Sequence, residues 1–208
     1  MAKQKRNAAL TKEKIITNAM LLFAKNGYDA TTTDDIAKQA AVNKAMIYYY
    51  YKNKSTLYAE VMSHVLDAIY QEIISKESQD PLKDLENFIA TYALYCHSNP
   101  SLPALLLREL SDSGAHLPQE MFANMRQLFA LLSKILAEGE KQKIFKNVEP
   151  MMIHFMIVGT INLLVTTAPL RKIASELDAG LNTCHECSIE KITEYIYEKI
   201  KLMLEVQQ

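Results

Sequence analysis

The 208-residue sequence predicts an all-α fold in two parts, an N-terminal three-helix domain and a larger helical domain behind it. Only five glycines and six prolines are present, and no long run alternates apolar with polar residues, which leaves little for a β-sheet. Apolar residues instead recur every three or four positions, the period of an amphipathic helix. We place the boundary near residue 54, which gives domains of residues 1–54 and 55–208.

The first helix is expected to end at Gly27, because glycine readily adopts the left-handed conformation that closes a helix. Its apolar face contains Ile15, Ala19, Leu22 and Phe23. The basic segment before it, residues 1–7, has two interpretations. It is either a disordered, solubilising tail or an arm that brings Arg6 to DNA phosphates or the minor groove.

Two short capped helices joined by a tight turn are expected over residues 31–50. Thr31, Thr32 and Thr33 can accept a hydrogen bond from a first-turn amide, and the carboxylates that follow favour the positive end of the helix dipole. Asn43 is the second cap and opens a helix over residues 44–50. A small helical corner of any all-α protein would show the same caps. The arrangement nevertheless matches a helix-turn-helix, whose second helix enters the major groove.

Four consecutive tyrosines, Tyr48 to Tyr51, cannot all face one core, because successive helical residues project about 100° apart. Tyr51 shares a face with Ile47 and is expected inside, whereas the other three present hydroxyls suited to phosphate oxygens. Asn53 is expected to cap the next helix. The residues predicted to contact double-stranded DNA are Arg6, Thr32, Thr33, Asn43, Lys44, Ala45, Tyr48, Tyr49, Tyr50 and Lys54.

From residue 27 to residue 57 the chain resembles the DNA-binding domain of the TetR (tetracycline-repressor) family of bacterial regulators. The family pattern appears here as Gly27-Tyr28, Thr32, Ile36-Ala37, Ala40-Ala41-Val42-Asn43, Ile47-Tyr48-Tyr49-Tyr50-Tyr51, Lys54 and Leu57. Three residues depart from it, since Ala41 replaces the turn glycine, Asn43 replaces serine and Tyr51 replaces phenylalanine. The resemblance implies a ligand-responsive transcriptional regulator, expected to be a repressor, that binds a near-palindromic operator as a homodimer.

The charge distribution agrees with DNA binding by one end of the chain. The formal net charge is only −1, but residues 1–60 hold ten Lys and Arg against five Asp and Glu. Residues 61–208 hold thirteen against nineteen. A basic segment on an acidic body is expected when only the basic part meets phosphates.

Beyond residue 54, prolines and polar breaks divide the chain into further helices. One long helix is marked by Leu57, Val61, Val65, Ile69 and Ile73, which recur every four residues. The predicted helices cover residues 54–76, 82–97, 105–110, 119–141, 150–167 and 188–205.

Residues 150–170 carry no charged side chain and are long enough to be considered as a membrane span. Polar residues around the helix, among them His154 and Asn162, and the lack of an aromatic belt favour burial in an assembly without a membrane. Together with the last helix, this segment from two chains would make a four-helix bundle, which the family resemblance also implies. The predicted interface is Ile153, Ile157, Ile161, Leu164, Ile192, Ile196 and Ile200.

The second domain is rich in methionine and aromatic residues, which either fill an ordinary core or line a ligand cavity. The family resemblance favours a cavity, and flexible methionines suit loosely specific apolar ligands. We therefore expect a small hydrophobic effector and no cofactor. The predicted lining residues are Met62, Leu66, Tyr92, Tyr95, Met121, Met125 and Phe155.

Cys184, His185 and Cys187 form a compact cluster, but a C-x-x-C pair is only half of a structural zinc site and the second pair is missing. Ordinary reduced thiols are the preferred interpretation, with metal or redox sensing here as the alternative function. Without a signal peptide, a cytoplasmic location is expected. The absence of phosphate-loop, H-E-x-x-H and nucleophile-elbow motifs argues against an enzyme. A helical ligand carrier without DNA function is the remaining alternative.

Overall fold

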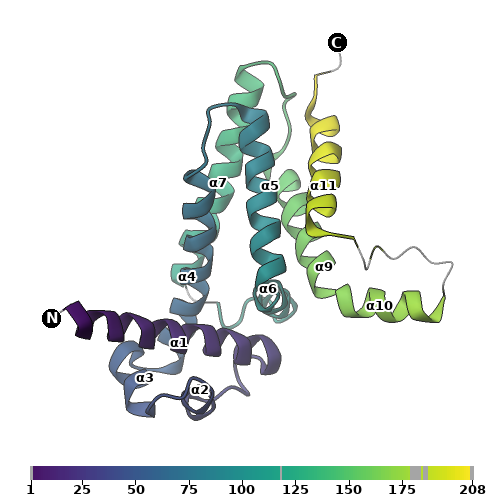
Figure 1. The fold of residues 1–208 in the computed structure, drawn as a ribbon. Helices are drawn as coiled ribbons and strands as arrows, with labels where there is room; N and C mark the ends of the chain where they lie inside the picture. Colours follow the sequence, from purple (N-terminus) through teal and green to yellow (C-terminus); the bar gives the residue numbers. More distant parts are fainter. Residues whose placement is uncertain (1, 118, 179–183, 185–186, 207–208) are drawn as a thin grey trace. The chain divides into compact units, whose positions relative to one another are not determined.

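The computed structural model describes residues 2–117, 119–178, 184 and 187–206, and every regular element among them is helical (Figure 1). An isolated β-bridge joins Phe145 and Glu205. The all-α prediction is thus confirmed. The helices are α1 (Ala2–Asn26), α2 (Thr33–Gln39), α3 (Lys44–Tyr51), α4 (Lys54–Ile74), α5 (Pro81–Ser98), α6 (Ser101–Ser111), α7 (Gln119–Lys141), α8 (Pro150–His154), the π-helical segment η1 (Phe155–Gly159), α9 (Thr160–Thr166), α10 (Ala168–Leu177) and α11 (Ile189–Leu204).

These helices form two compact units. The first contains Met1–Asp67 and Ala104–Asn124, and the second contains Ala68–Pro103 and Met125–Gln208. The first unit thus runs past the boundary expected near residue 54, as far as Asp67 in α4, and also takes in most of α6. A local sequence pattern does not reveal this association, since it links segments about fifty residues apart in the chain.

The first unit has a fully closed apolar core. Ile15 and Phe23 of α1, Ile36 of α2, Ile47 of α3 and Leu57 of α4 are all completely buried. α1 ends as predicted at Gly27, whose φ is +85° and whose amide donates to the Phe23 carbonyl. At its other end the backbone is helical from Ala2. The side chain of Arg6 lies outside the described part of the chain.

In the second unit α11 lies along α5, and α5 packs against α9 (Figure 1). Their contact contains a buried polar group, in which the Tyr92 hydroxyl donates to Asn162 Oδ1 over 2.9 Å. Both side chains are 3% exposed, and burial raises the pKa of Tyr92 well above its ordinary value. A satisfied polar pair in an apolar core favours one register between helices, because any slip would leave both groups unpaired.

The helix expected over residues 150–167 is interrupted and followed by one that the sequence did not predict. α8 and α9 flank η1, and α10 begins after Thr167, with Pro169 in its first turn, where a proline is tolerated. No single helix of the described residues is long and apolar enough to cross a membrane. Residues Pro150–Thr166 and Ala168–Leu177 are long and apolar enough only when they are taken together, and a bend of 59° separates them.

The turn between α2 and α3 is closed without a glycine. The Val42 amide donates to the Ala37 carbonyl and the Ala41 amide to the Lys38 carbonyl, the two bonds that end many helices. This geometry places Ala41 at φ +52°, a left-handed conformation that costs a residue with a Cβ roughly 1–2 kcal/mol. The sequence departs from its family pattern at this strained position.

Replacing Ala41 with glycine should stabilise the protein. Relief of the strain outweighs the extra freedom that glycine gives the unfolded chain, so the free energy of unfolding should rise by about 0.5–1 kcal/mol. Urea unfolding at one fixed protein concentration measures it. Ala45→Gly, within α3, is the matched control and should lower stability. An Ala41→Gly variant no more stable than the wild type would contradict the strained turn.

Candidate nucleic-acid interface

A reciprocal pair of hydrogen bonds fixes the start of α2. The Thr32 hydroxyl accepts from the Asp35 amide over 3.1 Å, and the Asp35 carboxylate accepts from the Thr32 amide over 3.3 Å. The hydroxyl and then the amide of Thr32 lower the pKa of Asp35. This capping box satisfies amides that no helical carbonyl can reach. It orients α2 with Thr32 exposed to solvent.

The caps predicted for the next two helices are confirmed. Asn43 Oδ1 accepts from the Ala45 amide and Asn53 Oδ1 from the Thr56 amide, each over 2.8 Å. One cap lies directly before α3 and the other lies shortly after it, so neighbouring residues fix both ends of the helix. Burial of its apolar residues decides which face of α3 is turned to solvent. Asn43, Lys44 and Ala45 are all exposed at the amino end of α3.

The tyrosines divide as expected. Ile47 is completely buried and Tyr51 is 4% exposed, whereas Tyr48 and Tyr49 are 45% and 79% exposed. Tyr50 is half-buried. The Tyr51 hydroxyl donates to the Lys12 carbonyl of α1 over 3.4 Å. Burial, followed by the neighbouring Glu60, raises its pKa to about 12.

Polar contacts join α3 to α2. The hydroxyls of Thr33 and Tyr48 lie 3.2 Å apart, within hydrogen-bond distance. Lys44 Nζ lies 2.6 Å from the Asp34 carboxylate, and this hydrogen bond raises the pKa of Lys44. Because Thr33 is 9% exposed, its side chain holds the two helices together and is not open to a ligand.

Lys54, a predicted DNA contact, is engaged inside the first unit. Its ammonium donates to the Tyr28 carbonyl over 3.0 Å and lies 4.2 Å from the centre of the Tyr28 ring. The exposed cation at this end of α3 is Lys52, whose φ of +65° ends the helix. Lys52 is not among the DNA contacts predicted from the sequence. The signal that could have identified it is its position directly after the tyrosine run.

α6 is attached to the N-terminal helices by three polar contacts, all within the first unit. Arg108 donates to the Lys25 carbonyl over 3.3 Å at the carboxyl end of α1. The Tyr58 hydroxyl of α4 donates to the Glu109 carboxylate. After α6, His116 lies between Asp29 and Asp112, at 3.4 and 3.3 Å. Together these contacts tie α6 and its following loop to the helix-turn-helix.

Glu109 and Tyr58 are both deeply buried, at 2% and 0% exposure. One carboxylate oxygen accepts from Tyr58, and the other has no hydrogen-bond partner in the described structure. Burial, followed by the bond to Glu109, raises the pKa of Tyr58 far above that of a free tyrosine. The pair therefore depends on the tyrosine proton, because a carboxylate left alone in an apolar core is costly.

The predicted ligand-lining residues are distributed over both units. Met62 and Leu66 are buried in the first unit. Tyr92, Tyr95 and Met125 are buried or half-buried in the second, where Phe155 is 62% exposed. The side chain of Met121 lies outside the described part of the chain.

Most of the predicted interface residues are buried within the chain itself. α9 and α11 pack on α5. The apolar residues that these helices leave exposed therefore differ from those that the spacing of apolar residues in the sequence indicates. Leu164 and Ile192 are half-buried. Five isoleucines are at most 6% exposed: Ile153, Ile157, Ile161, Ile196 and Ile200.

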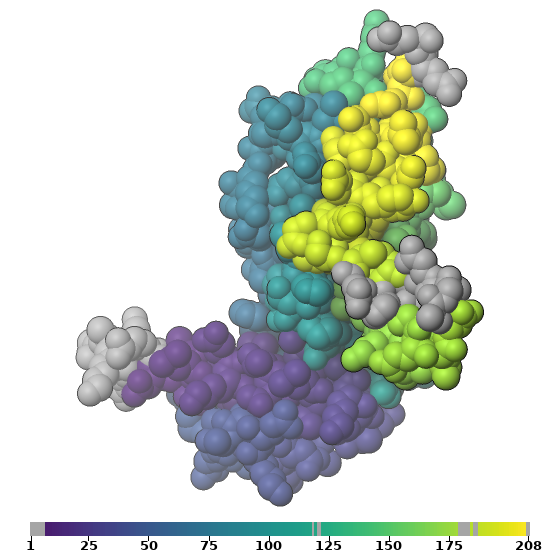
Figure 2. All heavy atoms as spheres, turned by 45° about the vertical axis from the view of Figure 1, so that its right-hand side comes forward, coloured from purple at the N-terminus to yellow at the C-terminus, as the bar shows by residue number. Residues whose placement is uncertain are grey.

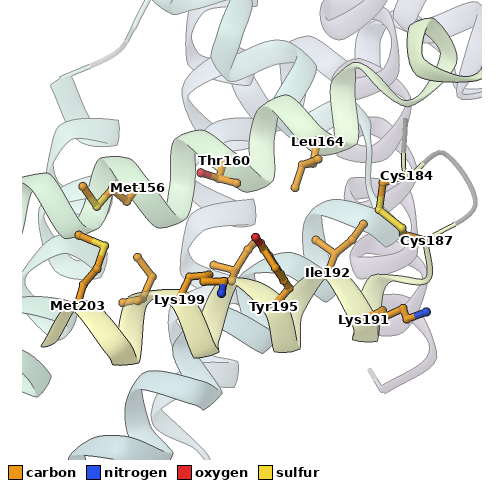
Figure 3. Close-up of a pocket in the computed structure, with 12 residues that line it drawn as sticks. Met156, Thr160, Leu164, Cys184, Cys187, Lys191, Ile192, Tyr195, Lys199 and Met203 are labelled. Atoms are coloured by element: carbon orange, nitrogen blue, oxygen red, sulfur yellow. A yellow bond between two sulfur atoms is a disulfide. The ribbon is translucent and has the colours of Figure 1, made fainter. Parts of the chain in front are cut away.

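Between α9 and α11 lies an apolar groove of about 620 Å³ on the second unit (Figure 3). Figure 2 shows α11, coloured yellow, on the surface of this unit. Tyr195, which lines the groove, is 65% exposed. The lining residues are Met156, Thr160, Leu164, Cys184, Cys187, Lys191, Ile192, Tyr195, Ile196, Lys199, Ile200 and Met203.

The cysteine cluster contains a disulfide between Cys184 and Cys187. His185 lies outside the described residues. Within the described ranges, no group of three or more His, Cys, Asp and Glu side chains is arranged to hold a metal ion.

The capped α2, the tight turn and the exposed face of α3 define a helix-turn-helix domain, a fold that places its second helix in the major groove. Residues 15–61 match the tetR family of bacterial regulatory proteins, and residues 81–178 match a tetracyclin repressor-like C-terminal domain. The chain belongs to the TetR family of bacterial transcriptional regulators. The family comprises regulators and not enzymes.

Two relatives illustrate the match. Over 140 residues the chain is 31% identical to a probable HTH-type transcriptional regulator, YttP of Bacillus subtilis, covering 64% of this chain and 66% of that protein. Over 68 residues it is 38% identical to IcaR of Staphylococcus aureus, a negative regulator of the biofilm operon icaADBC, covering 33% and 37%. The chain thus matches just under two thirds of the first relative and little more than a third of the second.

Solved structures share the fold. A TetR family transcription regulator from Marinobacter aquaeolei superposes with a TM-score of 0.75 at 18% identity, covering 99% of this chain and 100% of that one. FadR from Bacillus subtilis, solved in complex with stearoyl-CoA, gives 0.70 at 22% identity, covering 92% and 98%.

Removing the Tyr58 hydroxyl should destabilise the first unit. Tyr58→Phe leaves Glu109 without a donor and should lower the free energy of unfolding by about 1–3 kcal/mol. Chemical denaturation measures the loss. Tyr28→Phe, in the same ring cluster, is the control and should cost less. Adding Glu109→Leu to Tyr58→Phe should recover much of the stability, since both polar partners are then gone. Full stability of the single Tyr58→Phe variant would show that the pair contributes nothing.

Proposed function

We propose that this chain is a ligand-responsive repressor that binds a near-palindromic operator as a homodimer in the cytoplasm. A small, mostly apolar ligand releases it. The observation that supports the proposal of DNA binding is the exposed face of α3, which presents Asn43, Lys44, Tyr48 and Tyr49 together. Amide, ammonium and phenol groups on one helix suit base edges and phosphates of a major groove.

We assign two roles to the proposed DNA contacts. Thr32, Asn43, Lys44 and Ala45 are exposed beside the tyrosines and would touch the duplex, joined by Lys52. Thr33 and Lys54 instead hold α2 and the α1–α2 connection in place. Tyr48 contributes to both roles, because its hydroxyl lies against Thr33 while its ring remains 45% exposed.

The apolar groove between α9 and α11 supports the homodimer. Its lining residues on α11 recur at three or four positions from Lys191 to Met203, the pattern of a helix that packs on other helices. A second copy related by two-fold symmetry would seat the same helices there and complete a four-helix bundle. Two copies of α3 would then read inverted half-sites.

Repression and ligand release rest on the relatives. IcaR is a negative regulator, and FadR was solved with stearoyl-CoA, which carries a long apolar chain. An apolar effector of this chain would select one conformation of its body, and the heads would no longer match the half-site spacing. The polar contacts of α6 with α1 and α4 give such a change a route to the helix-turn-helix.

Binding to operator DNA should weaken with salt and depend on the cations of α3. Lys52→Ala should reduce the slope of log affinity against log salt by about one for each copy bound. Lys44→Ala should weaken binding more, because it also leaves Asp34 unpaired and facing phosphate. Gel shifts over a salt series measure both, with Lys172→Ala of α10 as the control. Binding that is absent or insensitive to salt would contradict the proposal.

Introducing a charge into the groove should separate the dimer. Tyr195→Asp places a carboxylate against the apolar face of the second copy and should yield monomers in sedimentation equilibrium. Leu202→Asp is the matched control, because Leu202 is 60% exposed on α11 but does not line the groove. If Tyr195→Asp remains dimeric, the chains associate through another surface.

A further inference from the structure

Cys184 and Cys187 occupy one end of the apolar groove. Figure 3 shows their disulfide beside Ile192 and Leu164, with Met156 and Met203 at the opposite end. Both cysteines are half-buried and line the groove directly. The pair thus lies at the edge of the proposed dimer face, within reach of solvent.

The third cysteine of the chain has the opposite environment. Cys96 is completely buried under α9, and burial raises the pKa of its thiol to about 12. A thiol that neither ionises nor meets solvent does not exchange with a disulfide. Any thiol chemistry of the folded chain therefore falls on Cys184 and Cys187.

We propose that Cys184 and Cys187 form a reversible thiol–disulfide site whose oxidation state tunes dimerisation. Its reaction partners are soluble disulfides, such as oxidised glutathione, and their thiols. The inference rests on the proposed dimer and adds an input separate from the apolar ligand.

The reaction balances as ordinary thiol–disulfide exchange. The thiolate of one cysteine attacks a sulfur of the external disulfide, forming a mixed disulfide and releasing one thiolate. The second cysteine thiolate attacks the protein-side sulfur, which forms the Cys184–Cys187 bond and releases the second thiolate. The protein dithiol loses two electrons and two protons, and the external disulfide becomes two thiols. Excess thiol reverses both steps.

The surroundings favour this exchange. Cys187 directly precedes Ser188, the N-cap of α11, and the positive end of the helix dipole favours a negatively charged thiolate there. Lys191, one turn into α11, also lines this end of the groove and adds positive charge. Both features stabilise the thiolate form that reacts.

The bond also affects the shape of the groove. The Cys187 amide donates to the Cys184 carbonyl over 3.4 Å, so a hydrogen bond and the disulfide both join these two residues directly before α11. The bonded pair lines one end of the groove. Reduction releases this cross-link and gives Cys184 and Cys187 conformational freedom, which dimerisation must then remove again. The oxidised chain should therefore dimerise more tightly.

The test uses the full chain equilibrated in glutathione buffers from fully reduced to fully oxidised. Thiols are trapped by alkylation and counted by mass spectrometry. We expect Cys184 and Cys187 to change together and Cys96 to remain unlabelled in the folded protein. The dimer dissociation constant, measured by sedimentation in each buffer, should be about fivefold or more lower in the oxidised state, the lower end of couplings between sites. Cys184→Ser with Cys187→Ser should abolish the difference.

Three results would overturn the proposal. They are a pair that stays reduced in oxidised glutathione, a disulfide that forms between chains, and a dimer constant equal in both states. The last would leave the proposed repressor intact. A redox-dependent dimer that binds no DNA in any state would instead support this site and refute the repressor. Monomers in every buffer would refute the dimer and this proposal together.

Discussion

The crossing of α2 and α3 is the constraint on which the account depends. Ile36 and Ile47 are buried in the core of the first unit. The Thr33–Tyr48 and Lys44–Asp34 contacts join polar groups of the two helices. The strained turn at Ala41 shows that the two helices are held firmly enough to impose a left-handed residue. With the crossing fixed, the outward face of α3 is fixed as well.

In the proposed repressor, a ligand can regulate DNA binding only if the position of the exposed face of α3 depends on the rest of the protein. Within the first unit, α6 touches the carboxyl end of α1 through Arg108 and the middle of the core through Glu109. The buried Tyr58–Glu109 contact suits a two-state element, because it is either made or costly to lose. The groove of the second unit meets the other requirement of the proposed dimer, since a single α3 would read only half of a palindrome.

Helix caps and inward-facing side chains could be predicted from the sequence where the interacting residues are close together in the chain. Thr32, Asn43 and Asn53 cap residues two or three positions away, and Tyr51 points inward because it follows Ile47 by one helical turn. The use of Lys54 was not predictable, since its acceptor, the Tyr28 carbonyl, lies 26 residues away. Apolar periodicity likewise marked the isoleucines of α9 and α11 but not that α5 covers them. α10 was missed because Pro169 can either stop a helix or occupy its first turn.

Selection of bound DNA from a random pool tests the central claim most directly, because it reports recognition, symmetry and spacing in one readout. The purified chain should enrich two inverted half-sites whose centres lie about one helical turn of DNA, or a multiple of it, apart. Enrichment of a single unpaired half-site would contradict the dimeric reader. A pool that remains random at low salt would contradict DNA recognition by α3 altogether.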